Sequence, residues 1–374
     1  TLDDLINAKP VMENLFSKKW YRKLIKNKQE VMIGYSDSGK DAGKMCASWH
    51  QYKAQEEIVK LAKKFNIEVV FFHGRGGSAG RGGGPIQATL RSLPPNSVNG
   101  KIRITDQGEV IQQKYGYEPL AKYNICSYIG AVTEATLNPP PAPKNNWRDL
   151  IEKMSGISKS SYRKNINQSS DFIRYFKIVT PHVALGKLSI GSRPSKRKNV
   201  DNIKSLRAIP WVFAWTQVRL MLPAWLGSTE ALRYAYYKRS RKILFDMERN
   251  WPFFNAMLDM LDMVISKVDP DISKIYEEFL ADESLKKVGR KLRLEFDIIK
   301  KLNKKITPKE IALIRKPFRS PIIVRNIYTE VLNIIQPVVI KKLKVNKNLK
   351  NKQYLNDALL TSIAGISAAM KNTG

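Results

Sequence analysis

The 374-residue sequence is 43% hydrophobic and 26% charged, which allows a sizeable core and excludes a wholly disordered chain. Lys and Arg number 65 against 33 Asp and Glu, so the formal net charge is +32. That charge permits a nucleic-acid partner. The basic clusters are scattered along the chain, however, in segments that are also rich in Asn and Ile. This distribution favours a coding bias over a binding footprint.

The first 120 residues predict alternating strands and helices. Val31 to Tyr35 is a short apolar run that ends in a Ser-Asp-Ser-Gly turn, as a buried parallel strand does. Apolar residues at helical spacing predict a helix from Asp41 to Phe65. Glu68 to Phe72 and Ile102 to Thr105 predict two further strands. The first two strands and their helix form a βαβ unit, so the loops at their carboxyl ends share one edge.

From Asn138 onward the pattern is mainly helical. Pro139 to Pro143 predicts a rigid connector, and breaks are expected near Gly191 and Pro270. Leu285 to Lys309 is highly charged and predicts a solvated helical face. An α/β barrel wrapped in helices and a doubly wound sheet both fit this order of elements.

The sequence carries no sign of secretion or of a membrane span. It opens at Thr1 without a charged and apolar leader, so no signal peptide is expected. The longest apolar stretch, Ile209 to Gly227, contains Gln, Arg and two prolines, which predicts a buried core segment. Two cysteines, Cys46 and Cys126, are too few for a disulfide framework or a structural zinc site. A reduced, cytoplasmic setting is therefore expected.

The run from Gly34 to Gly43 lies where the first strand ends and a helix begins. Ligands gather at this position in α/β folds. Asp37 offers hard oxygen ligands suited to Mg²⁺ or Mn²⁺, and Lys40 offers a point charge for a small anion. An N-cap turn with a solvated lysine would give the same residues, so the pattern alone leaves both interpretations open.

His73 immediately follows the second predicted strand and opens a glycine-rich run that extends to Pro85. Arg75 and Arg81 can fork onto phosphate or carboxylate oxygens, and the six glycines after Arg75 let backbone N–H groups approach an oxyanion closely. Ordering so many glycines is costly, which suits a loop that closes over a substrate. A flexible linker and an RGG-type nucleic-acid segment are the alternatives.

A third motif, between Ile190 and Trp211, contains two further arginines. Arg193 lies in a Gly-Ser-Arg-Pro turn, and Arg207 lies beside the apolar stretch, where a lone guanidinium is costly unless it is paired. A substrate phosphate would pair either of them. For Arg193 a solvated basic turn is an equal alternative.

In order and spacing these motifs resemble the phosphoenolpyruvate carboxylase family. The resemblance extends to Ala214 to Gln217 and to the ending Asn372 to Gly374, and so covers the whole chain. It implies that residues 1–374 are the C-terminal part of the catalytic barrel of such an enzyme, less than half of a full-length member. The implied fold is an α/β barrel similar to a TIM barrel, with predominantly α-helical additions. This chain would hold the later barrel strands and the C-terminal helices.

The resemblance also implies roles for single residues. Asp37 would be one of two carboxylates that hold Mg²⁺ or Mn²⁺. The catalytic residues at bicarbonate would be Lys40, His73 and Arg75. Substrate binding would fall to Arg81, Arg193 and Arg207, with Arg81 in the mobile glycine loop and also able to bind an acidic inhibitor. Lys267, Arg325 and Asn372 would form an allosteric site for aspartate or malate, although without the family they resemble ordinary surface residues.

The implied enzyme is a cytoplasmic homotetramer that converts phosphoenolpyruvate and bicarbonate into oxaloacetate and phosphate, replenishing the tricarboxylic acid cycle. The family's essential histidine and its second metal carboxylate belong to an N-terminal part that is absent here. His73 therefore does not take that histidine's role, and the chain by itself is expected to be incomplete as a catalyst. A basic nucleic-acid-binding protein and an inactive remnant of the carboxylase are the alternative functions.

Overall fold

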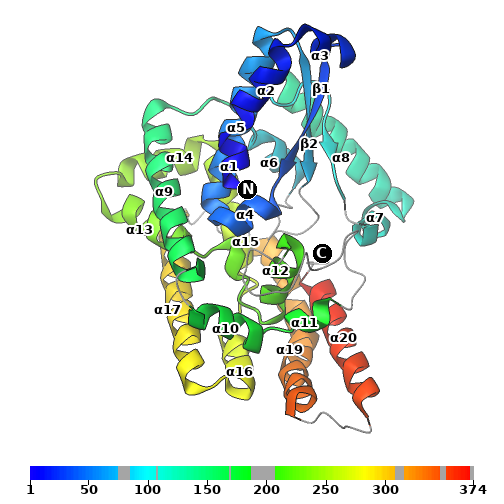
Figure 1. The fold of residues 1–374 in the computed structure, drawn as a ribbon, viewed down its shortest axis with the longest axis vertical. Helices are drawn as coiled ribbons and strands as arrows, with labels where there is room; N and C mark the ends of the chain where they lie inside the picture. The colour runs from blue at the N-terminus through cyan, green and yellow to red at the C-terminus, as the bar shows by residue number, and fades with distance from the viewer. Residues whose placement is uncertain are drawn as a thin grey trace.

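The computed structural model describes residues 1–74, 85–106, 108–167, 170–186, 207–307, 316–345 and 351–370. Across these ranges the chain is mostly helical, with one small parallel sheet at the upper end of the view in Figure 1. Four of the residues singled out from the sequence lie outside the described residues: Arg75, Arg81, Arg193 and Asn372.

The sheet contains three parallel strands in the order β1-β2-β3. These are β1 (Lys28–Gly34), β2 (Glu68–Gly74) and β3 (Arg103–Ile104). The predicted strands and their parallel direction are confirmed, but the expectation that the first strand is buried is wrong. In β1 only Ile33 is buried, and Met32 is 62% exposed, because the other edge of β1 is unpaired among the described strands. The sheet is a small part of a chain dominated by helices, so the fold class is α-rich with a short parallel sheet.

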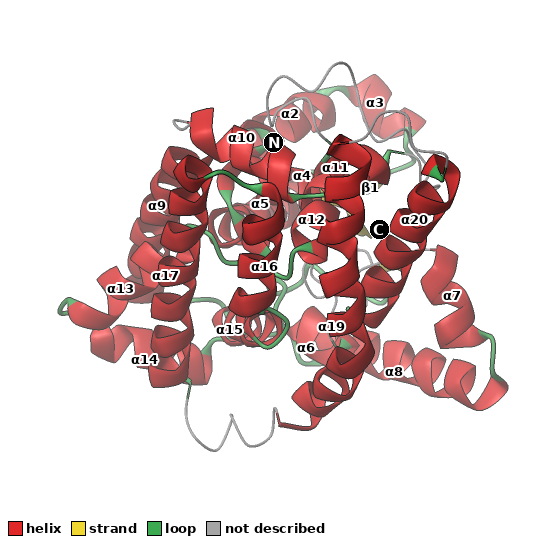
Figure 2. Cartoon of the chain, turned by 90° about the horizontal axis from the view of Figure 1, so that it is seen from below, coloured by secondary structure: helices red, strands yellow, loops and turns green. Residues whose placement is uncertain are grey.

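Helices form most of the structure outside the sheet (Figure 2). Before β3 they are α1 (Leu2–Ile6), α2 (Ala8–Ser17), α3 (Lys19–Leu24), α4 (Ser36–Ala42), α5 (Lys44–Lys64) and α6 (Ile86–Arg91). In the middle of the chain they are α7 (Gly108–Tyr115), α8 (Glu118–Leu137), α9 (Asn145–Asn167), α10 (Ser170–Val179) and α11 (His182–Leu185). The later ones are α12 (Ala208–Gln217), the 3₁₀ turn η3 (Leu222–Ala224), α13 (Ser228–Tyr237), α14 (Arg241–Asn250), α15 (Pro252–Ile265), α16 (Pro270–Leu280), α17 (Glu283–Ile306), α19 (Lys316–Val345) and α20 (Lys352–Ala369).

The connection between β1 and β2 differs from its prediction in one respect. A single helix was expected from Asp41 to Phe65, but the chain forms two helices that meet at Gly43. Gly43 has φ +80° and ψ 155°, a conformation that is essentially restricted to glycine, and this ends α4 before α5 begins. The motif at the end of β1 is therefore itself a short helix.

The sheet and the helices around it share a small core. Ile33 and Phe71, on β1 and β2, pack with Ile58 and Leu61 of α5, and α2 contributes Phe16. Alternate strand residues face this cluster, and residues of α5 one helical turn apart meet them. This packing explains why the βαβ pattern was readable from the sequence.

The larger core lies among the helices. The stretch from Ile209 to Gly227 is almost wholly buried in it, as predicted, and includes Trp211, Trp215 and Trp225 at 0% exposure. Among the described residues no helix is long and apolar enough to cross a membrane. The connector after α8 has no regular structure, as expected of Pro139 to Pro143.

The charged segment near Leu285 forms α17, but the prediction of a solvated helical face holds for one side only. The other side carries a stripe of buried residues that belongs to the larger core: Leu285, Leu292, Phe296, Ile299, Leu302 and Ile306. The abundant charges obscured this apolar period of three to four residues.

In the middle of helix α19 the polar side chains are buried and the apolar side chains are exposed. It lies beside α20, and its inward side chains are polar: Thr329, Asn333 and Gln336 are all 0% exposed. Gln336 donates to Gln217 Oε1 at 3.1 Å and to Ser362 Oγ at 3.0 Å, and Asn333 donates to the Gln217 carbonyl at 2.8 Å. The outward side chains are apolar and exposed: Ile323, Val324, Ile327, Tyr328, Val331, Ile334 and Ile335.

Candidate active site

The candidate site lies at the carboxyl edge of the sheet. The register aligns Ile33 with His73 and Gly34 with Gly74, so β1 and β2 end side by side. The turn into α4 consequently begins beside His73. The third strand reaches the same edge, where the Thr105 N–H donates to the His73 carbonyl at 3.0 Å. Ligand sites of parallel α/β sheets lie at this edge.

Helix α4 carries two of the residues singled out from the sequence. Asp37 is exposed in its first turn, and Lys40 is half-buried in its last turn. The helix begins one residue after β1, and the Ser38 hydroxyl donates to the Gly34 carbonyl at 2.8 Å. Asp37, Lys40 and His73 are therefore gathered at one edge of the sheet, as the strand–turn–helix pattern predicted.

Side chains remote in sequence hold α4 in place. The Tyr162 hydroxyl, from α9, donates to the Lys40 carbonyl at 2.8 Å. Arg163 donates to Asp41 Oδ1 at 3.2 Å, and the Leu2 N–H donates to Asp41 Oδ2 at 2.9 Å. These contacts orient the end of the helix from which Lys40 projects.

Gly43 fits closely against the same tyrosine. A Cβ atom at this position would lie 3.1 Å from Tyr162 Cγ and 3.2 Å from Tyr162 Cβ. Glycine is therefore required at this position for two reasons: its backbone conformation is one that other residues avoid, and a side chain would collide with Tyr162 of α9. Sequence reasoning missed Tyr162, because its partner lies more than a hundred residues away and no spacing rule connects them.

His73 is held from the strand side. It is 1% exposed, and its Nδ1 lies 2.8 Å from the Tyr35 hydroxyl. The Gln51 side chain of α5 donates to Ser38 Oγ at 2.8 Å and to the Gly34 carbonyl at 3.1 Å. This polar network ties the end of β1 to α5, beside the Tyr35 hydroxyl that meets His73 Nδ1.

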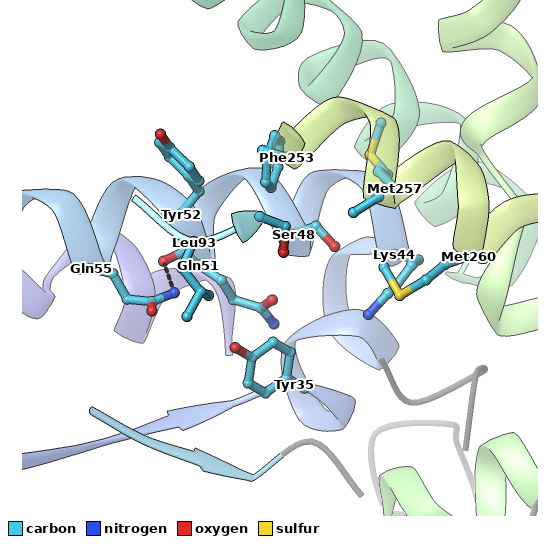
Figure 3. A pocket seen from close by; sticks show the side chains of 12 residues that line it. Tyr35, Lys44, Ser48, Gln51, Tyr52, Gln55, Leu93, Phe253, Met257 and Met260 are labelled. Atoms are coloured by element: carbon cyan, nitrogen blue, oxygen red, sulfur yellow. Dashed lines mark hydrogen bonds between the residues drawn. The ribbon is translucent and has the colours of Figure 1, made fainter. Parts of the chain in front are cut away.

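A small cavity adjoins Tyr35 on the α5 side. Figure 3 shows the Tyr35 ring below Gln51, with Lys44 and Met260 to one side. The lining is formed by Tyr35, Lys44, Ser48, Gln51, Tyr52, Gln55, Ser92, Leu93, Phe253, Ala256, Met257 and Met260. Its volume of about 30 Å³ is enough for about two water molecules and far below that of a substrate pocket. The cavity is therefore too small to hold a substrate.

Arg207 stands at the start of α12, which packs against α4. It is half-buried, and within the described part of the chain its Nε is buried without a hydrogen-bond partner. Buried donors are normally paired, so this nitrogen is suited to an anion. Arg75, Arg81 and Arg193 lie outside the described residues, and their arrangement relative to Arg207 stays a prediction.

Of the three residues assigned to an effector site, Lys267 and Arg325 lie within the described residues and Asn372 lies outside them. Lys267 is 6% exposed and donates to the Met370 carbonyl at 2.8 Å. Met370 ends α20 two residues before Asn372. Lys267 is thus a buried residue, and the view of it as an ordinary surface lysine is wrong.

Arg219 connects this lysine to α19. Its Nε donates to the Lys267 carbonyl at 3.0 Å, and its Nη2 donates to Asn326 Oδ1 at 3.0 Å, next to Arg325. The guanidinium is 1% exposed, and burial lowers the pKa of Arg219. Its Nη1 has no hydrogen-bond partner among the described residues. Sequence reasoning noted Arg219 only as a polar residue in an apolar run and gave it no role.

The described residues supply only part of a metal-binding site. No group of three or more His, Cys, Asp or Glu side chains is close enough to hold an ion in the ranges that the structure describes. The exposed carboxylate of Asp37 is a hard oxygen donor and fits Mg²⁺ or Mn²⁺ as one ligand. Further ligands would have to come from elsewhere.

Comparison with known proteins identifies the family. The family model described as phosphoenolpyruvate carboxylase matches residues 1–374. Phosphoenolpyruvate carboxylase of Shewanella oneidensis is 45% identical over 376 residues, covering 100% of this chain and 43% of the relative. Those of Hahella chejuensis and Aliivibrio salmonicida are each 46% identical, over 375 and 377 residues, covering 100% of this chain and 42% and 43% of the relatives. The chain thus spans less than half the length of these relatives, and it belongs to the phosphoenolpyruvate carboxylase family.

Proposed function

We propose that this chain is the C-terminal part of an enzyme that carboxylates phosphoenolpyruvate with bicarbonate, giving oxaloacetate and phosphate. The observation that carries the proposal is the register of β1 and β2, which brings Asp37, Lys40 and His73 to one edge of the sheet in a chain of this family. A carboxylate for a cation, an ammonium group and an imidazole at one edge suit two anionic substrates.

The three strands would be part of an α/β barrel that is completed by strands outside this chain. β1 pairs with β2 alone among the described strands, so its other edge is open to a further strand. Met32 on this edge strand is 62% exposed. An apolar side chain on an unpaired strand edge is a feature that proteins normally cover.

The chemistry would proceed in two stages. A bicarbonate oxygen attacks the phosphorus of phosphoenolpyruvate, the bond from phosphorus to the enol oxygen breaks, and carboxyphosphate and the enolate of pyruvate form. Carboxyphosphate then breaks down to CO₂ and phosphate, and the enolate carbon attacks CO₂ to give oxaloacetate. Mg²⁺ or Mn²⁺, held by Asp37 and a second carboxylate, would act as a Lewis acid toward the enolate oxygen.

Each residue then has a defined task. Lys40 and His73, with Arg75, would hold bicarbonate against the phosphorus. Arg207 and Arg193 would neutralise the charge that develops on the transferring phosphoryl group. The glycine loop that holds Arg81 would exclude water, which would otherwise protonate the enolate to pyruvate.

The family also suggests regulation and assembly. The Arg219–Lys267 cluster, which joins α19 to the end of α20, supports a site for aspartate or malate formed by Lys267, Arg325 and Asn372. We extend the proposal to a homotetramer in the cytoplasm, a setting that fits the two free cysteines, Cys46 and Cys126.

The test uses the chain joined to the part of the enzyme that precedes it. Oxaloacetate formation from phosphoenolpyruvate and bicarbonate is measured for the parent, Lys40→Ala and Arg75→Ala. Both variants should lose activity by about 100-fold or more, because each removes a preorganised charge from the reacting anions. Lys60→Ala is the matched control, since its side chain is 61% exposed on α5. Equal activity in all four proteins would refute the assignment.

The same experiment separates the alternative functions. An inactive remnant would fold and show no turnover in any variant. A nucleic-acid-binding protein would instead retain DNA or RNA with an affinity that falls steeply as salt rises.

A further inference from the structure

The pair formed by Tyr35 and His73 carries an inference beyond these roles. The two side chains meet at 2.8 Å between the Tyr35 hydroxyl and His73 Nδ1, and both are buried, at 5% and 1% exposure. Tyr35 is the first residue after β1, and His73 is the sixth of the seven residues of β2. The hydrogen bond therefore joins the two strands at the edge where the candidate site lies.

The chemistry of the two groups gives this bond a direction. A phenol O–H is a good donor and an imidazole nitrogen is a good acceptor, whereas a phenol oxygen is the weaker acceptor for an imidazole N–H. A neutral imidazole carries one proton on one of its two nitrogens. When Tyr35 donates to Nδ1, the proton of His73 is on Nε2, and Nε2 becomes a donor.

Tyr35 is itself held firmly enough to impose this choice. Ser38 Oγ, which accepts from Gln51, lies 3.3 Å from the Tyr35 carbonyl. The Lys44 ammonium lies 5.9 Å from the centre of the Tyr35 ring, a cation–π distance. Because α4 holds the Tyr35 backbone and Lys44 of α5 lies over its ring, the hydroxyl is presented to His73 from a supported position.

We propose that Tyr35 is a positioning residue that fixes His73 as the neutral tautomer protonated on Nε2, so that this nitrogen donates a hydrogen bond to an anionic substrate. The anion is bicarbonate, and that part rests on the proposed function. Tyr35 itself does not touch the substrate. Its contribution is to select the proton position of a residue that does, as second partners of reactive histidines commonly do.

The tautomer can be measured without any activity. The chain has three histidines, so ring-¹⁵N-labelled histidine gives a simple long-range ¹H–¹⁵N spectrum, and His73→Gln identifies the His73 signals. The measurement is made on the full 374-residue chain at about pH 8, above the ordinary pKa of histidine. We expect an unprotonated Nδ1 and a protonated Nε2 for His73 in the parent, and loss of this single form in Tyr35→Phe.

Tyr52→Phe is the matched control. Tyr52 lines the same cavity and is also buried, at 2% exposure, but its hydroxyl does not bond to His73. Its variant should keep the parent pattern. A protonated Nδ1 in the parent overturns the proposal, and so does the same spectrum from both tyrosine variants. If Tyr35→Phe fails to fold, as judged by circular dichroism, the parent spectrum still decides.

A kinetic arm uses the complete enzyme. Tyr35→Phe should raise the KM for bicarbonate by about tenfold, the factor carried by one hydrogen bond, with a smaller effect on the KM for phosphoenolpyruvate. A loss of folded protein alone would lower the apparent kcat and leave both KM values unchanged. An inactive parent with the expected tautomer would refute the proposed function and leave the pairing intact, so the two failures are distinguishable.

Discussion

The fit of Gly43 against Tyr162 makes the replacement Gly43→Ala a demanding test of how the candidate site is supported. The backbone of Gly43, at φ +80° and ψ 155°, lies in a region that other residues avoid, and forcing alanine into it costs about 1–3 kcal/mol. The new Cβ would also lie 3.1 Å from Tyr162 Cγ, which adds about 1 kcal/mol of overpacking because α9 is part of the core. The free energy of unfolding should therefore fall by about 2–4 kcal/mol.

The assay is urea unfolding followed by circular dichroism, with the midpoint compared at constant slope. Gly39→Ala supplies the control within the same helix. A Cβ at Gly39 has nothing within 4 Å, and alanine favours a helix over glycine by about 0.5–1 kcal/mol. Gly39→Ala should thus be neutral or stabilising. If the two variants unfold at the same urea concentration, Gly43 does not control the join between α4 and α5, and the reasoning fails.

Three further predictions concern buried polar contacts. Tyr162→Phe removes the donor to the Lys40 carbonyl and should lower the unfolding free energy by about 1–3 kcal/mol; an unchanged urea midpoint would contradict this. Arg219→Lys keeps the charge, but one ammonium group cannot reach both the Lys267 carbonyl and Asn326 Oδ1. We expect the free energy of unfolding to fall by about 1–3 kcal/mol, and aspartate to raise the melting temperature less than it does in the parent. An increase in melting temperature equal to that of the parent would count against the effector cluster. Burial raises the pKa of Glu277 above its ordinary 4.5, so the protonated form is favoured by folding. The stability that this group contributes is fully present below about pH 4.5 and is lost as pH rises through the raised pKa. The unfolding free energies of the parent and of Glu277→Gln, measured by urea titration, should therefore diverge as pH rises. Unfolding free energies that change equally with pH in both proteins would exclude the effect.

Local pattern was sufficient for the elements around the candidate site. The run ending at Tyr35 and the run from Glu68 became β1 and β2, because each combines a continuous apolar stretch with a polar turn, and a βαβ unit permits one direction of pairing. The same logic placed Asp37, Lys40 and His73 at a common edge. The join at Gly43 was missed, since a glycine within a helical pattern indicates a break only when its backbone conformation is known.

The contacts that orient these residues were beyond sequence reasoning. Tyr162 bonds to the Lys40 carbonyl across 122 positions, and Arg219 bonds to the Lys267 carbonyl across 48. Partners at such separations follow from how helices pack in three dimensions and leave no local spacing to detect. The buried state of Lys267 was missed for this reason, because its acceptor is a backbone carbonyl at the end of α20.

The family was identified from the resemblance of its motifs in order and spacing, which the comparisons bear out. Periodicity was enough for the parallel strands and for the edge at which the candidate residues gather, because these depend on neighbours in the chain. The orientation of α19 depended on its tertiary surroundings. Its apolar side chains, such as Ile327 and Ile335, face outward, while Asn333 and Gln336 face the core. The physical reason is that buried amides must find partners, and Gln217 and Ser362 supply them only after α12 and α20 have packed against the helix.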